Sequence, residues 1–591
     1  MSASPALQDG DIVFHNATIF SGVQEEKRFF GSVVVRGTDI LAVLRSDDAA
    51  AQQLEGELQN NAAITTIDCQ GGRWAICPGF IDMHAHSELS LLHTPDHLAK
   101  ITQGVTSEVL GQDGISYAPM TDETLPTIRS QIAGWNGKPE DEAFWRWRTV
   151  KQYLDTLDQT GVATNIAYLV PQGNLRMLVL GYDPRSATEK EIKQMQDILR
   201  IGFAEGAVGM SSGLTYVPGM YAPDSELAHL LRVVAEHGGY YSPHTRSYGK
   251  GAIKSYREMI ALARETGVRL HLTHATLNFA ENKGRAQEFL TMIDEAIAEG
   301  VQISLDTYPY LPSSTTLAAL LPSWAAEGGG SSAIMRRLAD PETRDRIRHD
   351  VEVLGTDGCH GCTLEWDVLE ISGSKDPNVV GKTIADVATQ RGSSTWDTFV
   401  DILIKDEFST TILQHVGHEE NVRTIMKHPQ HTGGSDGILT SAKPHPRGWG
   451  TFARYMGHYA RDLPQGKERQ IYLSDPGKLD AYQSVEPRRI FEGGLEEVIA
   501  HLTTRSARII GCYETKGHLA TGKRADLVVF DPDEISDMAT LVSPENSAKG
   551  IRSVLVNGQF AVQEGKRTKV RAGKTMRFRG RQGARGTLVA E

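Results

Sequence analysis

Two histidines one residue apart, His84 and His86, close the apolar segment PGFIDMHAH. Side chains two positions apart on a strand point to the same side of it, so both imidazoles can approach one metal ion. An H-x-H pair also occurs by chance. Whether this pair binds metal therefore depends on the side chains that the fold brings beside it.

Three further residues with suitable chemistry each follow or end a short apolar run. His244 closes GYYSPH, His274 closes VRLHLTH, and Asp436 follows HTGGS. If these runs are parallel strands of one barrel, their carboxyl ends meet at one mouth, together with the H-x-H pair. Neutral imidazoles and a carboxylate suit a divalent transition ion such as zinc. The sequence therefore predicts a metal site at that mouth.

Not every histidine fits this pattern. His415, His418, His428 and His431 are crowded into a helical or turn region, and we expect them to lie on a solvated surface. His445, in KPHPRGWG, is closer to the predicted site. Its role stays open at this point.

The five cysteines do not form a disulfide framework, because their number is odd and their spacing is wide. Cys359 and Cys362 form a C-x-x-C in DGCHGC, but a structural zinc site would need a second pair of ligands. We interpret this segment as an ordinary loop. Cys69, Cys77 and Cys512 are predicted to be buried small apolar residues.

The elements that carry the candidate ligands alternate between strands and helices. Eight apolar runs can form buried parallel strands, with helical patterns after each. They are AICPGFIDMHAH, VTSEVLGQ, TNIAYLVPQ, AVGMSSGL, GYYSPH, VRLHLTH, VQISLDTY and HTGGSDG. From Gly213 to Asp306 the run ends lie about 30 residues apart, the length of one β/α unit, but about 130 residues separate Asp306 from Asp436. We predict a TIM (β/α)8 barrel with an insertion before its last strand.

Both ends of the chain have the pattern of β-structure. The runs IVFHNATIF and SVVVRGTDILAVL near the start are matched by ADLVVFD and IRSVLVNGQFAVQEGK near the end, where Asn557-Gly558 is typical of a type I′ hairpin. Because chain termini often lie close together, we expect one small β-sandwich from both ends. We assign it residues 1–75 and 506–591, and assign the barrel residues 76–505, with the insertion at about 320–410.

Taken in order, these segments resemble the amidohydrolase superfamily, in its D-aminoacylase (N-acyl-D-amino-acid deacylase) branch. The resemblance rests on PGFIDMHAH, ITQGVTSEVLGQDG, SSGLTYVPG, SPHTRS, SLDTYPY, GSDG, PHPRGWGTFAR, ADLVVFDP and VLVNGQ. It runs from about residue 10 to about residue 575. It implies a TIM barrel with a small β-sandwich, one or two zinc ions at the barrel mouth, and hydrolysis of an amide bond.

The resemblance also implies roles for single residues. His84 and His86 match the H-x-H metal ligands, and His244 and His274 match the single-histidine ligands. Asp436 matches the catalytic aspartate.

Four more residues match substrate-binding positions of the family. Arg447 matches the carboxylate-binding arginine, whose guanidinium can hold a carboxylate through two hydrogen bonds. The alternative for Arg447 is a salt bridge at the barrel rim. Tyr216, Tyr308 and Ser314 match residues that line the substrate pocket, although Tyr308 fits equally well as a packed aromatic.

Two departures from the family's pattern concern the site itself. The family's second strand ends in a zinc-binding cysteine within a GNCG-like turn, whereas this chain has aspartate, Asp113, in GQDG. Because Asp113 stands at the matching position, we predict that it binds metal. Aspartate is a harder ligand than thiolate and can bridge two ions, so its metal selectivity can differ from that of the family. The alternative is a turn aspartate that hydrogen-bonds its own backbone. The family's lysine shortly after the sixth-strand histidine is missing from His274-Ala275-Thr276-Leu277-Asn278, and Thr276 is the second departure.

Composition restricts the class of protein. The 591 residues are 40% hydrophobic and 23% charged, as in an ordinary globular protein. A formal charge of −13 without a dense Lys/Arg cluster argues against a nucleic-acid partner. The N-terminus lacks a secretory pattern and no stretch approaches the roughly 18 apolar residues of a membrane span, so we expect a cytoplasmic protein without a membrane partner. The sequence indicates no particular oligomeric state.

Together these features predict a zinc-dependent amidohydrolase whose small-molecule substrate is an N-acyl amino acid, of D configuration by the resemblance. A metal-activated hydroxide would attack the linear amide with Asp436 as general base and then acid, and Tyr216 or a neighbour would hold the oxyanion. The products would be a carboxylic acid and a free amino acid.

Three alternatives stay open. A cyclic-amide hydrolase usually carries a carboxylated lysine at the fourth strand, where this chain reads GMSSGL. Hydrolysis of a dipeptide or an N-acyl-L-amino acid would use the same site. An inactive barrel that serves as a scaffold would have lost ligands, whereas here every histidine ligand and Asp436 is present.

Overall fold

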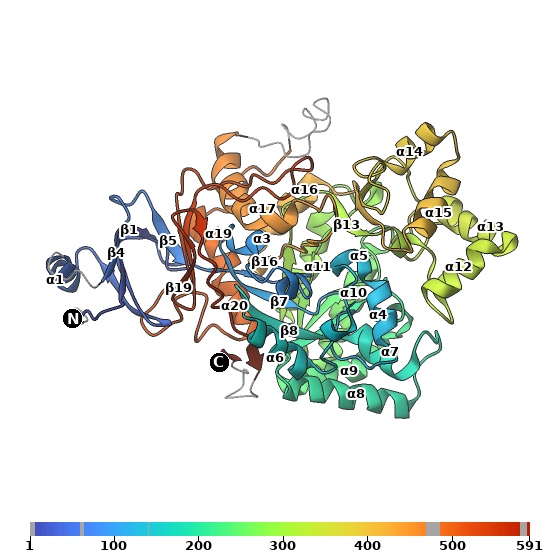
Figure 1. Cartoon of the computed structure of the whole chain (residues 1–591), viewed down its shortest axis with the longest axis horizontal. Helices are drawn as coiled ribbons and strands as arrows, with labels where there is room; N and C mark the ends of the chain where they lie inside the picture. The colour runs from blue at the N-terminus through green and yellow to red at the C-terminus, as the bar shows by residue number, and fades with distance from the viewer. Residues whose placement is uncertain (1–5, 59–63, 140, 468–484, 579–587, 591) are drawn as a thin grey trace.

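The computed structural model describes residues 6–58, 64–139, 141–467, 485–578 and 588–590, and an eight-stranded sheet forms its centre (Figure 1). All seven pairings between neighbouring strands are parallel, and β16 follows β12 in the sheet. The strands are β6 (Phe80–Asp82), β7 (Val105–Leu110), β8 (Asn165–Pro171), β9 (Gly209–Gly213), β10 (Tyr240–His244), β11 (Arg269–Leu272), β12 (Ile303–Thr307) and β16 (His431–Gly433).

Backbone hydrogen bonds close this sheet between its first and last strands. Met83 N donates to Gly433 O at 3.1 Å, and Asp436 N donates to His84 O at 2.8 Å. Ala85 also forms a parallel bridge with Gly437. The predicted TIM barrel is therefore confirmed, and its closure brings two candidate site residues into direct backbone contact.

Helices surround the barrel, and several neighbouring ones pack against each other. They include α6 (Val150–Thr160), α8 (Glu189–Ala204), α9 (Asp224–His237), α10 (Ala252–Thr266), α11 (Ala286–Ala298) and α16 (Glu419–Met426). In α9, Leu227, Leu230, Leu231 and Val234 are buried, as their helical spacing predicts. The helix ends at Gly238, which has a φ of 71°, a left-handed conformation that glycine adopts without steric cost.

Strands from both ends of the chain form one nine-stranded sheet, which confirms that the two ends build one β-structure together. Its members are β1 (Ile12–Ile19), β2 (Phe29–Arg36), β3 (Asp39–Arg45), β4 (Thr65–Asp68), β5 (Ala75–Pro78), β17 (Leu527–Phe530), β18 (Ile551–Val556), β19 (Gln559–Gln563) and β20 (Lys566–Arg567). The two ends meet where β5 pairs antiparallel with β17. Asn557 and Gly558 form the β18–β19 turn with φ values of 48° and 76°, as a type I′ hairpin requires.

The first predicted run contributes to both sheets. Ala75–Pro78 belongs to the terminal sheet as β5, and Phe80–Asp82 begins the barrel as β6. Gly79 lies between them, and a Cβ there would lie 2.2 Å from Thr106 Oγ1. Only glycine allows the chain to pass this close to β7, so the junction that precedes the H-x-H pair depends on it.

The insertion before the last barrel strand has its own small sheet and its own apolar core. The sheet has the order β13 (Ser313–Thr316), β15 (Thr411–Gln414), β14 (Leu369–Gly373). Four helices accompany it, namely α12 (Ser331–Ala339), α13 (Pro341–His349), α14 (Ile384–Arg391) and α15 (Thr395–Lys405). Figure 1 shows these helices at the opposite end of the molecule from the terminal sheet.

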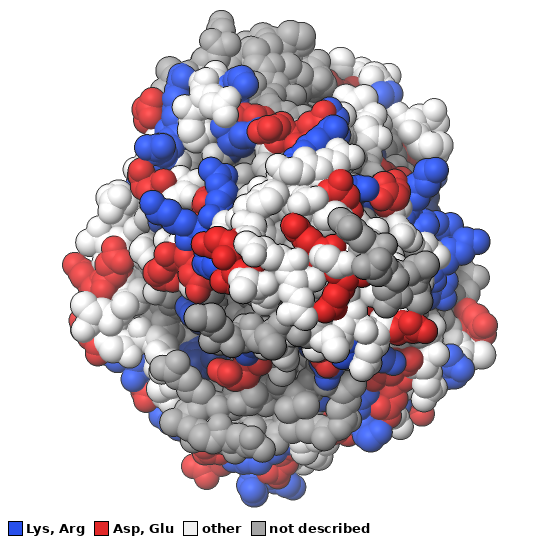
Figure 2. All heavy atoms as spheres, turned by 90° about the vertical axis from the view of Figure 1, so that its left-hand side faces the viewer, with Lys and Arg blue, Asp and Glu red and all other residues white. Residues whose placement is uncertain are grey.

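The surface at the end that carries the terminal sheet mixes both signs of charge. Figure 2 shows Lys and Arg side chains interspersed with Asp and Glu, with uncharged residues between them. In the described part of the chain, no helix is long and apolar enough to cross a membrane.

Candidate metal centre

The barrel strands deliver six of the predicted site residues to one place. They lie at or just beyond the carboxyl ends of β6, β7, β10, β11 and β16, and all six are buried: His84, His86, Asp113, His244, His274 and Asp436. Three of them, Asp113, His274 and Asp436, have positive φ values of 54°, 31° and 48°. Such conformations are costly for non-glycine residues and cluster at functional sites.

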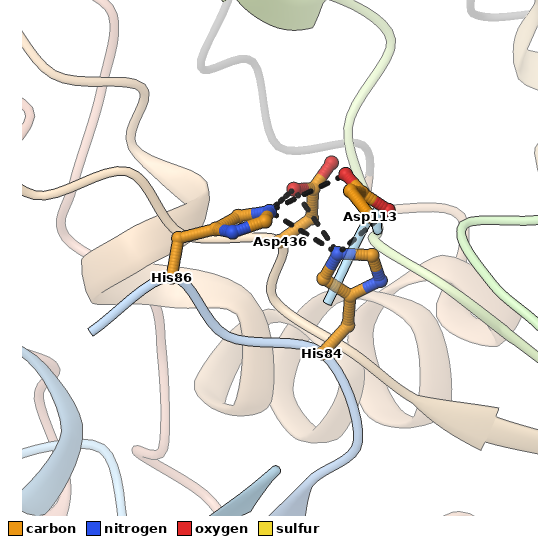
Figure 3. Close-up of side chains that lie close together, drawn as sticks. All are labelled: His84, His86, Asp113 and Asp436. Carbon is orange, nitrogen blue, oxygen red and sulfur yellow. Dashed lines mark hydrogen bonds and ion pairs between the residues drawn. The ribbon is translucent and has the colours of Figure 1, made fainter. Parts of the chain in front are cut away.

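Four of these side chains form the first group of possible metal ligands (Figure 3). Nε2 of His84 and Nε2 of His86 lie 3.3 Å apart. His86 Nε2 also lies 3.1 Å from Asp436 Oδ1 and 3.4 Å from Asp113 Oδ2. The two imidazoles and two carboxylates therefore converge on one small volume.

Asp113 also belongs to a second group, with His244 and His274. Its Oδ1 lies 3.3 Å from His274 Nε2, and its Oδ2 lies 3.7 Å from His244 Nδ1. Because Asp113 faces both groups, its carboxylate could serve as a ligand to an ion held by either of them.

One ring nitrogen of His244 has no partner in the protein, and this observation indicates that a metal ion fits here. Nδ1 of His244 is buried and has no hydrogen-bond partner, although it faces Asp113. Its other ring nitrogen, Nε2, lies 2.8 Å from Thr215 Oγ1, which orients the ring. Buried polar atoms are normally paired, and a metal ion would pair this one. The donor set of imidazoles and carboxylates suits zinc.

The charges around the cluster keep its carboxyl groups ionised. Burial by itself raises the pKa of Asp436, but the positive charges of Arg447 and then of His84 outweigh it and hold that pKa well below its usual value. The pKa of Asp113 is likewise well below its usual value, because nearby histidines outweigh the effect of burial. Both carboxylates are thus suited to bind a cation or accept a proton.

A layer of buried charged residues supports the ligands from below. Lys100 Nζ, on α3 (Leu98–Ile101), donates to Asp82 Oδ2 at 2.6 Å and to Ser435 Oγ at 2.7 Å. Asp82 Oδ1 in turn accepts from the backbone of His84 and Ser435. The network joins the first and last strands just beneath the cluster. Sequence reasoning missed it, because Lys100 carries no motif.

Asp306 supports His274 in the same way as Asp82 supports His84, through a hydrogen bond from the backbone of the histidine. Its Oδ1 accepts from His274 N at 2.8 Å, and its Oδ2 lies 2.9 Å from His271 Nε2. Gly434 packs against this carboxylate, and a Cβ at that position would lie 2.6 Å from Asp306 Oδ1 and 2.9 Å from His84 Cβ. Gly434, the second residue of the segment GGSDG, is therefore needed for the ligands to approach one another.

The predicted substrate-binding residues lie around the same cluster. Arg447, fully buried on α17 (Arg447–Arg454), places Nη2 2.9 Å from Asp436 Oδ2 and its guanidinium 4.5 Å from the centre of the Tyr308 ring. Tyr308 and Ser314 line a polar cavity that also contains Asp113 and Asp436. The Tyr216 ring lies 4.8 Å from that of His244.

His445, whose role the sequence left open, positions Arg447. Its Nδ1 accepts a hydrogen bond from Arg447 N at 2.9 Å, and its Nε2 lies 3.0 Å from Pro312 O. Burial is the first reason that the pKa of His445 lies well below its usual value, so the ring is neutral and can accept at Nδ1. No local signal in the sequence indicated this contact.

Two interpretations of the sequence need correction or extension. His428 and His431 are buried, not solvated. His431 begins β16, and its Nδ1 lies 3.0 Å from His501 Nδ1. Cys359 and Cys362 are free thiols, but the loop between them has a place at the site. His360 lines the polar cavity with its ring 6.3 Å from that of His244.

Comparison with known proteins gives consistent results. A sequence profile of the amidohydrolase family matches residues 65–562. The D-aminoacylase of Alcaligenes xylosoxydans xylosoxydans is 30% identical over 569 residues, which cover 96% of this chain and 98% of that protein. The N-acyl-D-glutamate deacylase of the same organism is 30% identical over 549 residues, 93% of each chain.

A similar solved structure is that of N-acyl-D-glutamate deacylase from Bordetella bronchiseptica, complexed with zinc and a phosphonate inhibitor that mimics the tetrahedral intermediate of the reaction. It matches with a TM-score of 0.74 at 28% identity and covers 96% of this chain and 99% of that one.

Proposed function

Because this chain belongs to the amidohydrolase family, we propose that it is a zinc-dependent hydrolase of N-acyl-D-amino acids, which releases a carboxylic acid and a free amino acid. Its likeness to a D-aminoacylase and an N-acyl-D-glutamate deacylase over almost the whole chain supports this reaction. The observation that carries the proposal is the buried cluster of imidazoles and carboxylates beside an arginine that retains unused hydrogen-bond donors.

The metal would be held by His84, His86, Asp113, His244 and His274. Zinc bound there supplies a Lewis acid that polarises the amide carbonyl and activates water near neutral pH. Asp113 faces both groups of donors, so it is the residue that allows either one or two ions.

Asp436 is proposed to move the proton. Its Oδ1 points to the ligand cluster at 3.1 Å from His86 Nε2, and Arg447 holds its Oδ2. A carboxylate with a lowered pKa is available at neutral pH as a proton acceptor. It would take a proton from the attacking water at Oδ1 and return it to the amine that leaves.

Arg447 is proposed to bind the carboxylate of the substrate. Its Nε and Nη1 are buried and have no hydrogen-bond partner, while Nη2 pairs with Asp436. Each of these nitrogens lies beside Nη2 on one edge of the guanidinium, so either one, together with the second N–H of Nη2, can hold the two oxygens of a carboxylate. This arrangement places the amino-acid end of the substrate next to Asp436, where the leaving amine needs a proton.

Three other residues are proposed to complete the substrate site. Tyr216 stands beside His244, and burial raises the pKa of its hydroxyl, so it remains a neutral donor for the developing oxyanion. Tyr308 stacks on the Arg447 guanidinium and keeps it in position. The backbone oxygen of Ser314 lies 3.5 Å from Arg447 Nη2, which orients the same group.

We also propose that the enzyme acts in the cytoplasm. Its five cysteines are free thiols, which fits a reducing compartment. The substrate is a small molecule, and we propose neither a nucleic acid nor a membrane as a partner.

Two measurements test the function together. Elemental analysis should find bound zinc, and the protein should release free methionine from N-acetyl-D-methionine in preference to the L enantiomer. Asp436→Asn should abolish turnover while leaving the protein folded. Bound zinc without turnover of either enantiomer would contradict the proposed substrate, and failure to bind zinc after reconstitution would contradict the enzymatic assignment.

A further inference from the structure

A second cavity adjoins the metal centre, and its lining differs in chemistry from that of the polar cavity. We call it the apolar cavity. Among the described residues that line it, none carries a charge, and they include Ile132, Trp135, Val217, Leu321, Ile334 and Phe408. Its volume, counted as the space that the centres of water molecules can occupy, is about 90 Å³.

Two polar side chains of the apolar cavity, Tyr182 and Gln131, are hydrogen-bonded. Tyr182 Oη donates to Gln131 Oε1 at 2.9 Å, and Gln131 Nε2 donates to Val217 O. Tyr216 Oη lies 3.3 Å from Oγ1 of Thr315, which lines the polar cavity, and Trp135 Nε1 is buried without a hydrogen-bond partner. An apolar ligand would leave the hydrogen bonds of Tyr182 and Gln131 intact.

This cavity reaches the reacting centre. Trp135 lines it, and its ring lies 5.0 Å from the ring of His86 and 5.1 Å from that of Tyr216. Thr215, Tyr216 and Ala319 line both the apolar and the polar cavity, so the two meet beside the candidate metal ligands. A substrate whose amide lies at the metal centre can therefore extend one group into each cavity.

The position of Arg447 determines which cavity receives the amino-acid half of the substrate and which receives its acyl group. Arg447 contacts Asp436, Tyr308 and Ser314, all of which line the polar cavity and none of which lines the apolar one. If Arg447 binds the carboxylate, the amino-acid half lies in the polar cavity. The acyl group extends from the other side of the amide carbon, toward Trp135.

We infer that the apolar cavity is the acyl-group site and that this enzyme is specific for N-acyl amino acids with long apolar acyl chains. The inference rests on the proposed function. The walls support it, because the segments after β7, β8 and β9 and the insertion contribute only uncharged residues to the lining, among them Leu321, Ile334 and Phe408. Burying apolar carbon against such a lining is favourable in proportion to the area removed from water.

The test compares N-acetyl-D-methionine with N-octanoyl-D-methionine, which differ only in the acyl chain. We expect kcat/KM of the wild-type protein to be at least about tenfold higher for the octanoyl substrate, since each added methylene in an apolar pocket changes discrimination measurably. Equal values for the two substrates would overturn the inference and leave the proposed function in place.

Two matched variants locate the acyl group. Ala318 is half-buried and lines the apolar cavity, so Ala318→Phe should fill it and lower the octanoyl-to-acetyl ratio of kcat/KM by about tenfold. Ala339 is exposed at the end of α12 and does not line the cavity, so Ala339→Phe should leave the ratio unchanged. An unchanged ratio in folded Ala318→Phe would place the acyl chain elsewhere.

A binding measurement separates this inference from the proposed reaction. Calorimetric titration with octanoate should show binding to the wild-type protein and weaker binding to Ala318→Phe, whereas acetate should show none. If neither amide is hydrolysed but octanoate binds in this way, the reaction is wrong and the apolar site stands. If octanoate does not bind to the wild-type protein, the acyl site is wrong.

Discussion

Arg447 and Asp436 form a buried ion pair, with Nη2 of the arginine 2.9 Å from Oδ2 of the aspartate. One guanidinium therefore holds the proposed proton acceptor and still has Nε and Nη1 without a protein partner. The two functions that the sequence suggested for separate residues are thus joined in one contact.

The first prediction concerns this arginine. Arg447→Ala should lower kcat/KM for N-acetyl-D-methionine by about 100-fold or more, because each lost hydrogen bond to a charged group is worth about 1.5–3 kcal/mol. N-acetyl-D-methionine amide, which has no carboxylate, should lose much less. Equal losses on both substrates would show that Arg447 acts only through Asp436. Arg185→Ala, an exposed arginine paired with Glu191, should change neither value.

The second prediction concerns Asp113, which stands where the family has a cysteine. Asp113→Ala should lower the zinc content per chain, since this carboxylate faces both groups of candidate ligands. Asp113→Cys should keep zinc bound, because thiolate is a good zinc ligand. Elemental analysis after dialysis measures both. An undiminished zinc content in folded Asp113→Ala would support the turn interpretation instead.

The third prediction concerns the buried lysine beneath the cluster. Lys100→Met would leave Asp82, whose carboxylate is fully buried, without its cation. Removing one partner of a buried pair typically costs about 3–5 kcal/mol, and we expect a loss of this size in the free energy of unfolding from denaturant titration. Lys193→Met, which removes an exposed lysine 3.8 Å from Asp197, should cost less than about 1 kcal/mol. Similar losses in the two variants would refute this role for Lys100.

The fourth prediction concerns acid stability. Glu108 is buried 2.7 Å from His97 Nε2 and 3.7 Å from Lys100 Nζ. Burial raises its pKa, but the charges of His97 and Lys100 outweigh this effect and lower it to about 2. A carboxyl group whose pKa is depressed in the folded state stabilises that state above its unfolded pKa of about 4.5. This stabilisation should disappear as the pH falls from about 4.5 to 2.

Thermal unfolding between pH 7 and pH 3 measures that dependence. The wild-type Tm should fall steeply below about pH 4.5, and Glu108→Gln should have a lower Tm at pH 7 with a shallower fall on acidification. Parallel curves for the two proteins would show that other carboxyl groups cause the acid sensitivity.

Much of the architecture was predictable from the sequence because local burial leaves a local pattern. Parallel barrel strands are covered on both faces, so they appear as continuous apolar runs, and the run beginning at Val105 became β7 as expected. Helix α9 was predicted from the spacing of its leucines and the glycines that follow it. The hairpin at Asn557-Gly558 was predictable because these two residue types readily adopt the positive φ values of a type I′ turn.

The candidate ligands were also recognisable in the sequence, because metal binding needs particular residue types at strand ends. The H-x-H pair, His244 and His274 lie where the runs predicted them, and the structure brings Asp113 into the same cluster. Their chemistry is a property of the side chains. Their grouping follows from the rule that parallel barrel strands end at one mouth.

Contacts between residues far apart in the chain were decided only by the tertiary structure. Lys100 beneath Ser435, His445 against Pro312, and His360 of the insertion beside His244 involve pairs that carry no mutual signal in the sequence. The same is true of the apolar cavity, whose walls come from three barrel segments and the insertion. Residue type and periodicity determine what an element can bury or bind, whereas partner identity and cavity shape depend on how distant elements pack, which short-range patterns do not encode.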